Sequence, residues 1–233
     1  MYSVLFSRIE VGMDLVSDKL KQIIPKNSKI AIFPWAFPVE IDAQKLNNDF
    51  FKKGGKRYNR YINELKKIGI EENDITVCNC YSDSKEKLKK VLKNSNVVIL
   101  PGGNPEMFFN KVVHDTEILY DIKHYKGIII GESAGTELQL KRYFITAKNN
   151  FYKYFSFYDG FGIIDDPFYI DVHSSNNSKY LSKLQKVANE KNKNVYAIYD
   201  DGAMIYNRDT KEVELFGNVR IFKHEKNKVV FYK

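Results

Sequence analysis

Short apolar runs and charged, helix-like stretches alternate along the first half of the chain. The apolar runs have the length of buried strands and lie at residues 29–33, 75–80, 97–100 and 128–130. Between them, apolar residues recur at helical spacing, and helices are expected at residues 58–68, 85–92 and 117–124. This alternation predicts βαβ units, with a mainly parallel sheet covered by helices on both faces. In such a sheet, ligands bind at the carboxyl ends of the strands.

The pattern changes after residue 135. A helix is expected at residues 136–143, and a turn-rich aromatic stretch follows it. Further along, the spacing predicts a strand at residues 168–173, a helix at 179–189 and a strand at 194–199. The tail, residues 203–232, has strand-like runs separated by turn residues at 207–209 and 225–227. The expected fold class is therefore α/β, with a mainly parallel sheet and C-terminal antiparallel hairpins.

The pentapeptide Gly131-Glu132-Ser133-Ala134-Gly135 directly follows one of the predicted strands. Flanking glycines permit the sharp strand-to-helix turn that holds a serine in a strained backbone conformation. The helix after the turn would direct its free N–H groups and positive dipole end at the serine, where an anion develops during acyl transfer. This segment predicts a nucleophile elbow with Ser133 as the nucleophile.

A second glycine motif, Pro101-Gly102-Gly103-Asn104, follows the predicted strand at residues 97–100. Glycine lets a backbone N–H approach a substrate oxygen without an intervening Cβ atom. The N–H groups of Gly103 and Ala134 would then form an oxyanion hole with two donors. Either motif alone also occurs as a plain turn between a strand and a helix, but the two together on adjacent βα units favour a catalytic site.

Four histidines are candidates for the general base. His114 and His124 fall in charged helical sequence and His224 in a charged hairpin, so these three are expected at the surface. His173 instead ends an apolar run and enters a polar loop, which is typical of an active-site residue. His173 is therefore the expected base.

The acid that orients this base is expected in the segment Asp200-Asp201-Gly202, which follows the predicted strand at residues 194–199. One aspartate of the pair would complete a triad, and the other would serve as a turn or capping residue. Four more aspartates compete for the role, namely Asp159, Asp165, Asp166 and Asp171.

Composition narrows the classes of function. The chain has 233 residues and no linker or low-complexity stretch, so one domain spanning residues 1–233 is expected. The net charge of +8 comes from scattered lysines, and no aromatic-rich RNA-binding signature accompanies them, which argues against a nucleic-acid partner. The N-terminal residues hold no long apolar run, so no membrane span or signal peptide is expected, and the expected location is cytoplasmic. The sequence leaves the oligomeric state open.

The two cysteines, Cys78 and Cys80, lie two residues apart in a predicted strand. Their side chains would share one face, where a bond between them is geometrically poor. Two cysteines are also too few for a structural zinc site. We expect buried free thiols.

Taken together, these motifs resemble peptidase family S51, which contains aspartyl dipeptidase (peptidase E) and cyanophycinase. The resemblance extends over residues 29–206, with the glycine loop at 101–104, the elbow at 131–135, the base segment at 171–173 and the acid segment at 200–202. It implies a three-layer αβα sandwich similar to class I glutamine amidotransferases, with serine in place of their cysteine. It also implies a serine-type peptidase that needs no metal and no cofactor.

Carried over residue by residue, the resemblance makes Ser133 the nucleophile, His173 the general base and then acid, and Gly103 and Ala134 the oxyanion donors. The third member of the family's triad is a glutamate, and the matching position here is Asp201, whose side chain is one methylene shorter. The implied reaction is hydrolysis of a peptide or isopeptide bond in small peptides through an acyl-enzyme.

Three residues are expected to bind substrate. Asn104 closes the glycine loop. Glu132 stands beside the serine, where the family has a neutral residue, and would repel an acidic substrate or select a basic one. Lys179 would replace the arginine that the family suggests for a substrate aspartate.

Two other functions are compatible with the sequence. An α/β-hydrolase esterase would use Ser133, then Asp200 or Asp201, then His224. Against it, the glycine loop lies only one βα unit before the serine, and His224 falls between hairpin strands. The second alternative is a non-enzymatic binding module that has an amidotransferase-like fold and an elbow without turnover.

Overall fold

The computed structural model describes residues 1–37, 43–146, 152–165, 167–224 and 229–232. The strands are β1 (Tyr2–Phe6), β2 (Ile30–Ile32), β3 (Ile75–Val77), β4 (Val97–Leu100), β5 (Ile128–Glu132), β6 (Arg142–Ile145), β7 (Ser156–Asp159), β8 (Tyr169–Val172), β9 (Val195–Asn207), β10 (Val213–Phe222) and β11 (Val229–Tyr232). The helices are α1 (Ile9–Ile23), α2 (Ala43–Leu46), α3 (Lys56–Lys67), α4 (Lys85–Asn94), α5 (Pro105–Val113), α6 (Thr116–Lys123), α7 (Ala134–Glu137) and α8 (Ser178–Lys191), with single turns η1 (Asn47–Phe51) and η2 (Glu72–Asp74). In these ranges no helix is both long and apolar enough to span a membrane.

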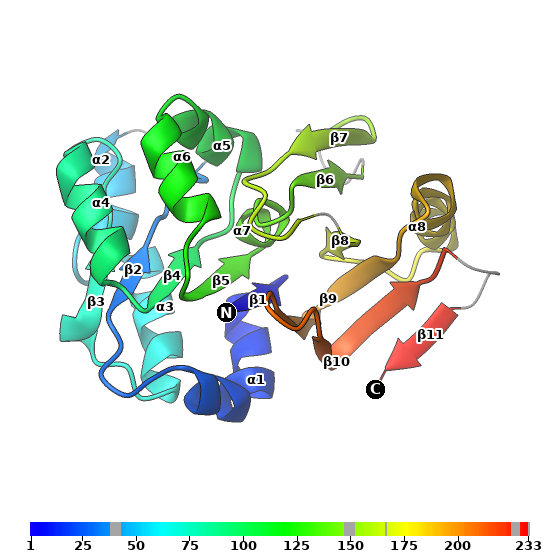
Figure 1. The fold of residues 1–233 in the computed structure, drawn as a ribbon, viewed down its shortest axis with the longest axis horizontal. Helices are drawn as coiled ribbons and strands as arrows, with labels where there is room; N and C mark the ends of the chain where they lie inside the picture. Colours follow the sequence, from blue (N-terminus) through cyan, green and yellow to red (C-terminus); the bar gives the residue numbers. More distant parts are fainter. Residues whose placement is uncertain (38–42, 147–151, 166, 225–228, 233) are drawn as a thin grey trace.

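The central sheet has the strand order β11-β10-β9-β1-β5-β4-β2-β3, and β8 also pairs with β9 (Figure 1). The pairs from β1 through β5, β4 and β2 to β3 are parallel, whereas β9, β10 and β11 pair antiparallel. The predicted α/β class, with a mainly parallel sheet and C-terminal hairpins, is confirmed. The turn at residues 207–209 forms, and the turn at 225–227 lies outside the described residues.

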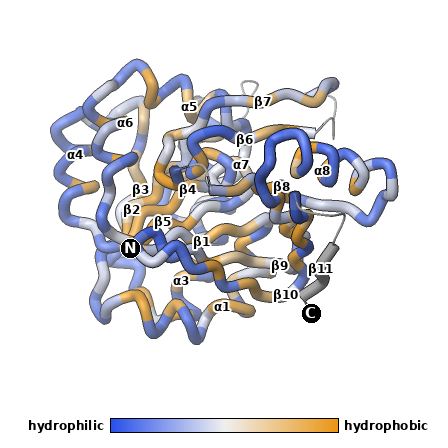
Figure 2. Tube along the Cα trace, turned by 45° about the vertical axis from the view of Figure 1, so that its right-hand side comes forward, coloured by the Kyte–Doolittle hydropathy of each residue, from blue (hydrophilic) through white to orange (hydrophobic). Residues whose placement is uncertain are grey.

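Successive strand residues face opposite layers of helices, as the period of two requires. In β4, Val97 and Ile99 pack with α1 and α3, whereas Val98 and Leu100 pack with α4, α5 and α6. The tube coloured by hydropathy shows the same arrangement, with apolar strands inside and polar helix surfaces outside (Figure 2). The continuous apolar runs in the sequence reflect this burial on both faces.

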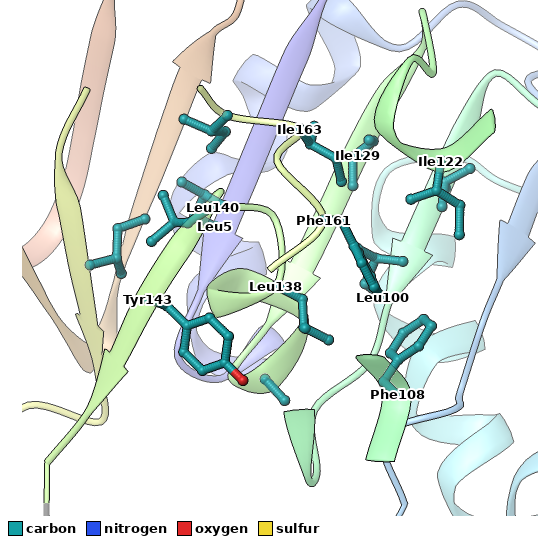
Figure 3. Packing of buried hydrophobic residues seen from close by; sticks show 14 of the residues in the cluster. Leu5, Leu100, Phe108, Ile122, Ile129, Leu138, Leu140, Tyr143, Phe161 and Ile163 are labelled. Atoms are coloured by element: carbon teal, nitrogen blue, oxygen red, sulfur yellow. The ribbon is translucent and has the colours of Figure 1, made fainter. Parts of the chain in front are cut away.

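Two local expectations differ from the structure. β1 and α1 are absent from the sequence-based prediction. The helix expected at residues 136–143 is only the short α7, and the chain then turns into β6. Figure 3 shows why: Leu138, Leu140 and Tyr143 reach into one apolar cluster with Phe108 and Phe161. Tertiary packing of these side chains therefore outweighs the local helical spacing.

β9 brings together the carboxyl ends of two other strands. One half of β9 pairs antiparallel with β1, where Phe6 lies opposite Ala203. The other half pairs parallel with β8, where Val172 lies opposite Ile198. β1 and β8 therefore both end beside residues 199–202, in the middle of β9. The segments that leave these two strands meet β9 at this point of the sheet.

Cys78 and Cys80 are free thiols just beyond β3. Burial raises the pKa of Cys78 to about 12 and that of Cys80 to about 11. Since the thiolate is the reactive form, we expect iodoacetamide to modify both at neutral pH at least ~100-fold more slowly than free cysteine. A mass-spectrometric time course tests this, with the guanidinium-unfolded protein as the fast-reacting control. Native thiols that react as fast as free cysteine would contradict it.

Candidate active site

The segment that joins β5 to α7 has the backbone of a nucleophile elbow. Ser133 adopts φ 49° and ψ −113°, a strained conformation for a residue with a side chain. A Cβ atom on Gly131 would lie 2.4 Å from the carbonyl oxygen of Gly135, and one on Gly135 would lie 1.7 Å from the carbonyl oxygen of Leu100. The turn therefore requires glycine at both flanking positions.

Hydrogen bonds to the end of β1 fix this elbow. The Ser133 N–H donates to the Phe6 carbonyl oxygen at 2.9 Å, and Oγ1 of Thr136 accepts from the Phe6 N–H at 3.1 Å. Thr136 is fully buried. On the other side, Leu138 packs near Leu100 in the apolar cluster of Figure 3. The serine thus stands on a rigid support.

His173 reaches the serine from the end of β8. Its Nε2 atom lies 2.9 Å from Oγ of Ser133. The chain turns there through a positive φ of 52° at His173, and Ser7 holds the turn: Oγ of Ser7 accepts from the His173 N–H at 3.0 Å and donates to the Ile198 carbonyl oxygen at 2.7 Å. Ser7, which follows β1, therefore positions His173, which follows β8.

Asp200, from the middle of β9, contacts the other side of the imidazole, so Ser133, His173 and Asp200 form a row. Its Oδ1 atom lies 2.6 Å from Nδ1 of His173, and its Oδ2 atom lies 2.8 Å from Nε of Arg8. A carboxylate only accepts hydrogen bonds, so Nδ1 carries the imidazole proton and Nε2 is free to accept the serine proton. The His173 and Asp200 side chains are 37% and 46% exposed, so a substrate has access to them.

This geometry corrects the expectation that Asp201 faces His173. β9 does not end at Tyr199 but continues to Asn207, so Asp200 and Asp201 are consecutive residues of one strand. Consecutive side chains of a strand point to opposite faces, and only one of them can face His173. Asp201 is exposed to solvent.

The glycine loop after β4 lies directly against the elbow. A Cβ atom on Gly102 would lie 3.1 Å from Cβ of Ser133. Gly103 has φ 144°, and a Cβ atom there would lie 1.6 Å from the Ala36 carbonyl oxygen. Gly103 is required for this close approach, and a Cβ atom on Gly102 would press against the Ser133 side chain.

Two backbone donors at this junction have no partner among the described residues. They are the N–H groups of Gly103 and Ala134. In contrast, the neighbouring N–H of Asn104 donates to the Ala36 carbonyl oxygen. Ala134 begins α7, where an N–H has no acceptor within its own helix. These are the two donors that the sequence pattern predicts for an oxyanion hole.

The three residues expected to bind substrate differ in their positions and contacts. Asn104 caps α5, because its side-chain oxygen accepts from the Met107 N–H at 3.2 Å, and it also accepts from the Tyr152 hydroxyl at 3.3 Å. Lys179 is exposed in the first turn of α8 and makes no hydrogen bond or ion pair with a described residue. Glu132 is only 3% exposed and is directed into the protein, so the expectation that it meets substrate is corrected.

The remaining histidines lie away from the row. His114 and His124 follow the last residues of α5 and α6, and His224 follows β10. Among the competing aspartates, Asp171 is buried and accepts from the Tyr180 hydroxyl at 2.5 Å. Since His173 is the histidine that contacts Ser133, the arrangement expected of an esterase, with His224 as base, does not form.

Over the described part of the chain, no cluster of three or more His, Cys, Asp or Glu side chains could hold a metal ion. The chemistry available at the junction is that of a nucleophilic hydroxyl, an imidazole, a carboxylate and backbone N–H donors.

Comparison with models of protein families shows to which family this chain belongs. The model of peptidase family S51 matches residues 56–214, which hold the glycine loop, the elbow, the histidine and both aspartates. The chain belongs to peptidase family S51. A search of curated proteins by sequence finds no match.

Solved structures agree with this S51 assignment at the level of the fold. A "Putative Peptidase E Protein" from Listeria monocytogenes EGD-e superposes with a TM-score of 0.60 at 20% identity, covering 92% of this chain and 96% of that one. A peptidase from an acI-B1 Actinobacterium gives a TM-score of 0.65 at 16% identity, covering 98% and 93%. Family membership supports a serine-type peptidase with a peptide substrate.

The sequence analysis of this S51 chain missed the first βα unit, and with it Ser7 and Arg8. A signal was available, since the apolar run at residues 2–6 precedes apolar positions at helical spacing, Ile9, Met13, Val16 and Leu20. The unit places two polar side chains at the carboxyl end of β1, next to the histidine and the acid.

Proposed function

We propose that this S51 peptidase hydrolyses a peptide or isopeptide bond in small peptides through an acyl-enzyme on Ser133. The observation that carries the proposal is the continuous row of contacts from Oγ of Ser133 through the imidazole of His173 to the carboxylate of Asp200. A nucleophile, a base and an orienting acid in hydrogen-bond contact are the components of a catalytic triad.

In the acylation step, Oγ of Ser133 attacks the scissile carbonyl carbon while Nε2 of His173 takes the hydroxyl proton. The imidazolium that results is stabilised by Asp200, which accepts from its Nδ1–H. The tetrahedral intermediate then collapses: the C–N bond breaks, and His173 gives its proton to the leaving amine. In deacylation, His173 takes a proton from a water molecule whose oxygen attacks the acyl carbon. The bond between this carbon and Oγ then breaks, and His173 returns the proton to Ser133.

The N–H groups of Gly103 and Ala134 stabilise the negative charge on the tetrahedral intermediate by hydrogen bonds. These donors are already in place and have no described partner, so no protein bond must break before they bind the oxyanion. In other serine hydrolases, removing one oxyanion donor lowers kcat by about 10²- to 10³-fold.

We propose that the substrate extends from Ser133 into a groove beside the glycine loop, of which Asn104 is a lining residue. The groove measures about 330 Å³ and is also lined by Glu106, Tyr152 and Tyr158. This volume is near the lower end of small-molecule sites, which suits a short peptide better than a folded protein. A library of dipeptides and isopeptides, assayed with the purified protein, would define the preferred side chains.

A fluorophosphonate probe tests the mechanism independently of the substrate. The probe reacts when Oγ of an activated serine displaces fluoride from phosphorus, so we expect one adduct, on Ser133. Labelling should disappear in Ser133→Ala and His173→Ala, and His224→Ala should be labelled at the wild-type rate. An unlabelled wild-type protein would favour the non-enzymatic binding module, and labelling that depends on His224 would favour the esterase.

A further inference from the structure

A buried carboxylate lies directly behind the nucleophile. Glu132 immediately precedes Ser133 and accepts hydrogen bonds from three donors. Its Oε1 atom accepts from the Ile9 N–H at 3.2 Å and from Nη2 of Arg60, and its Oε2 atom accepts from the Tyr61 hydroxyl. Three segments of the chain, the start of α1, the helix α3 and the elbow, thus converge on one carboxylate.

The same cluster reaches the glycine loop. The Gly102 backbone N–H faces the Tyr61 hydroxyl oxygen, and this hydroxyl donates its own proton to Glu132. A Cβ atom on Gly102 would lie 3.5 Å from Oε2 of Glu132, so the carboxylate and the loop are neighbours. One end of the cluster is therefore bonded covalently to Ser133, and the other end lies against Gly102, the residue before Gly103.

We propose that Glu132, Tyr61 and Arg60 are positioning residues that fix the glycine loop relative to the elbow and thereby set the separation of the two oxyanion donors. This inference rests on the proposed function for its catalytic consequence. With the Gly102 N–H directed at Tyr61, the Gly103 N–H is left without a partner among the described residues and can serve as the oxyanion donor. The requirement is strict, because oxyanion donors act only within a narrow range of distances.

The electrostatics of the cluster fit this role. A lone carboxylate beside a developing oxyanion would oppose it, but Arg60, which is always charged, lies in contact with Glu132 and compensates that charge. Burial is the main reason that the pKa of Tyr61 is raised well above its usual range, and the nearby Glu132 charge is the second. The hydroxyl therefore remains a donor to Glu132 at every pH at which the enzyme would work.

Glutamine cannot replace Glu132 in this arrangement. Each carboxylate oxygen accepts from at least one donor, whereas an amide would present an NH₂ group to the donors on one side. Glu132→Gln preserves the size of the side chain but must therefore break the hydrogen bonds at one of its two terminal positions. Tyr61→Phe is narrower, since it removes only the hydroxyl that links Glu132 to Gly102.

The test compares these two variants with two controls, one from α3, which also holds Tyr61, and one from α1. Tyr58→Phe removes a hydroxyl of α3 that bonds Glu72, and Glu10→Gln alters the outer, half-exposed partner of Arg60. Three quantities are measured: hydrogen exchange of the Gly102 backbone amide, turnover of a hydrolysed dipeptide, and the fluorophosphonate labelling rate. For Tyr61→Phe and Glu132→Gln we expect Gly102 exchange to rise about tenfold or more, and kcat and labelling to fall about 10- to 100-fold with KM within about twofold. Both controls should match the wild type.

Amide exchange, read against turnover and labelling, separates the ways in which the proposal could fail. Unchanged Gly102 exchange in Tyr61→Phe would overturn the link between the cluster and the loop. Faster exchange with wild-type kcat and labelling would overturn the catalytic consequence. Wild-type protein that is neither labelled nor active would refute the proposed function instead, and the exchange measurement would still decide whether Tyr61 holds the loop.

Discussion

Ser133→Ala is expected to lower kcat by about 10⁴- to 10⁶-fold, because it removes the only atom that can form the acyl-enzyme. The fold should survive, since the elbow is held by backbone bonds and by Thr136 rather than by the serine hydroxyl. The thermal midpoint should therefore stay within a few degrees of the wild type. The measurement is kcat for one dipeptide at one pH, paired with a thermal unfolding curve.

Ser175→Ala is the matched control, because Ser175 lies exposed in the polar loop after His173. It should keep at least half of the wild-type activity. Members of a triad act as a unit, so the double variant Ser133→Ala/His173→Ala should be no slower than either single variant. A Ser133→Ala protein with more than about a tenth of wild-type kcat would show that the nucleophile is another group.

The parts of the site that the sequence predicts well are those with a local cause. The two glycines of the elbow and Gly103 of the loop have no room for a Cβ atom, and this steric demand appears directly as a sequence motif. His173 is similar, because a histidine at the end of a buried strand is visible from the apolar run that precedes it. The spacing of these segments also led to the S51 resemblance that the family comparison confirms.

Residues whose role depends on long-range partners were harder to predict. Glu132 is adjacent to the serine, and proximity in sequence suggested a contact with substrate. Its partners Arg60 and Tyr61 lie 72 and 71 positions away in the chain, and no local pattern links them to the elbow. The βα unit that holds Arg8 has a local signal, but the role of Arg8 does not, since its link to Asp200 exists only after β1 and β9 pair.

The choice between Asp200 and Asp201 depended on where a strand ends. With a strand that stops at residue 199, both aspartates belong to a flexible turn, and the family pattern favoured Asp201. The observed β9 runs on to Asn207 because its second half pairs with β1 and β10. Within a continuous strand the two side chains must face opposite ways, so a shift of one position reverses the assignment.

Asp200→Asn is therefore expected to lower kcat by about 10⁴-fold, by analogy with the serine proteases. An amide preserves the shape of the side chain but can donate to Nδ1 of His173, which stabilises the tautomer whose Nε2 is already protonated and cannot accept the serine proton. The change also leaves Arg8 without its carboxylate partner. KM should change much less than kcat, because Asp200 acts on the base rather than on the substrate.

Asp201→Asn is the matched control, one residue further along the same strand with the same change of chemistry. Its side chain is exposed on the opposite face, so kcat should stay within about twofold of the wild type. Both variants are measured with one peptide over the same pH range, and both should fold, since Asp200 is only half-buried and Asp201 is exposed. Equal losses at the two positions, or a larger loss at Asp201, would mean that β9 has a different register in the working enzyme. In that case the acid must be assigned again, whereas the roles of Ser133 and His173, which rest on their own contact, would stand.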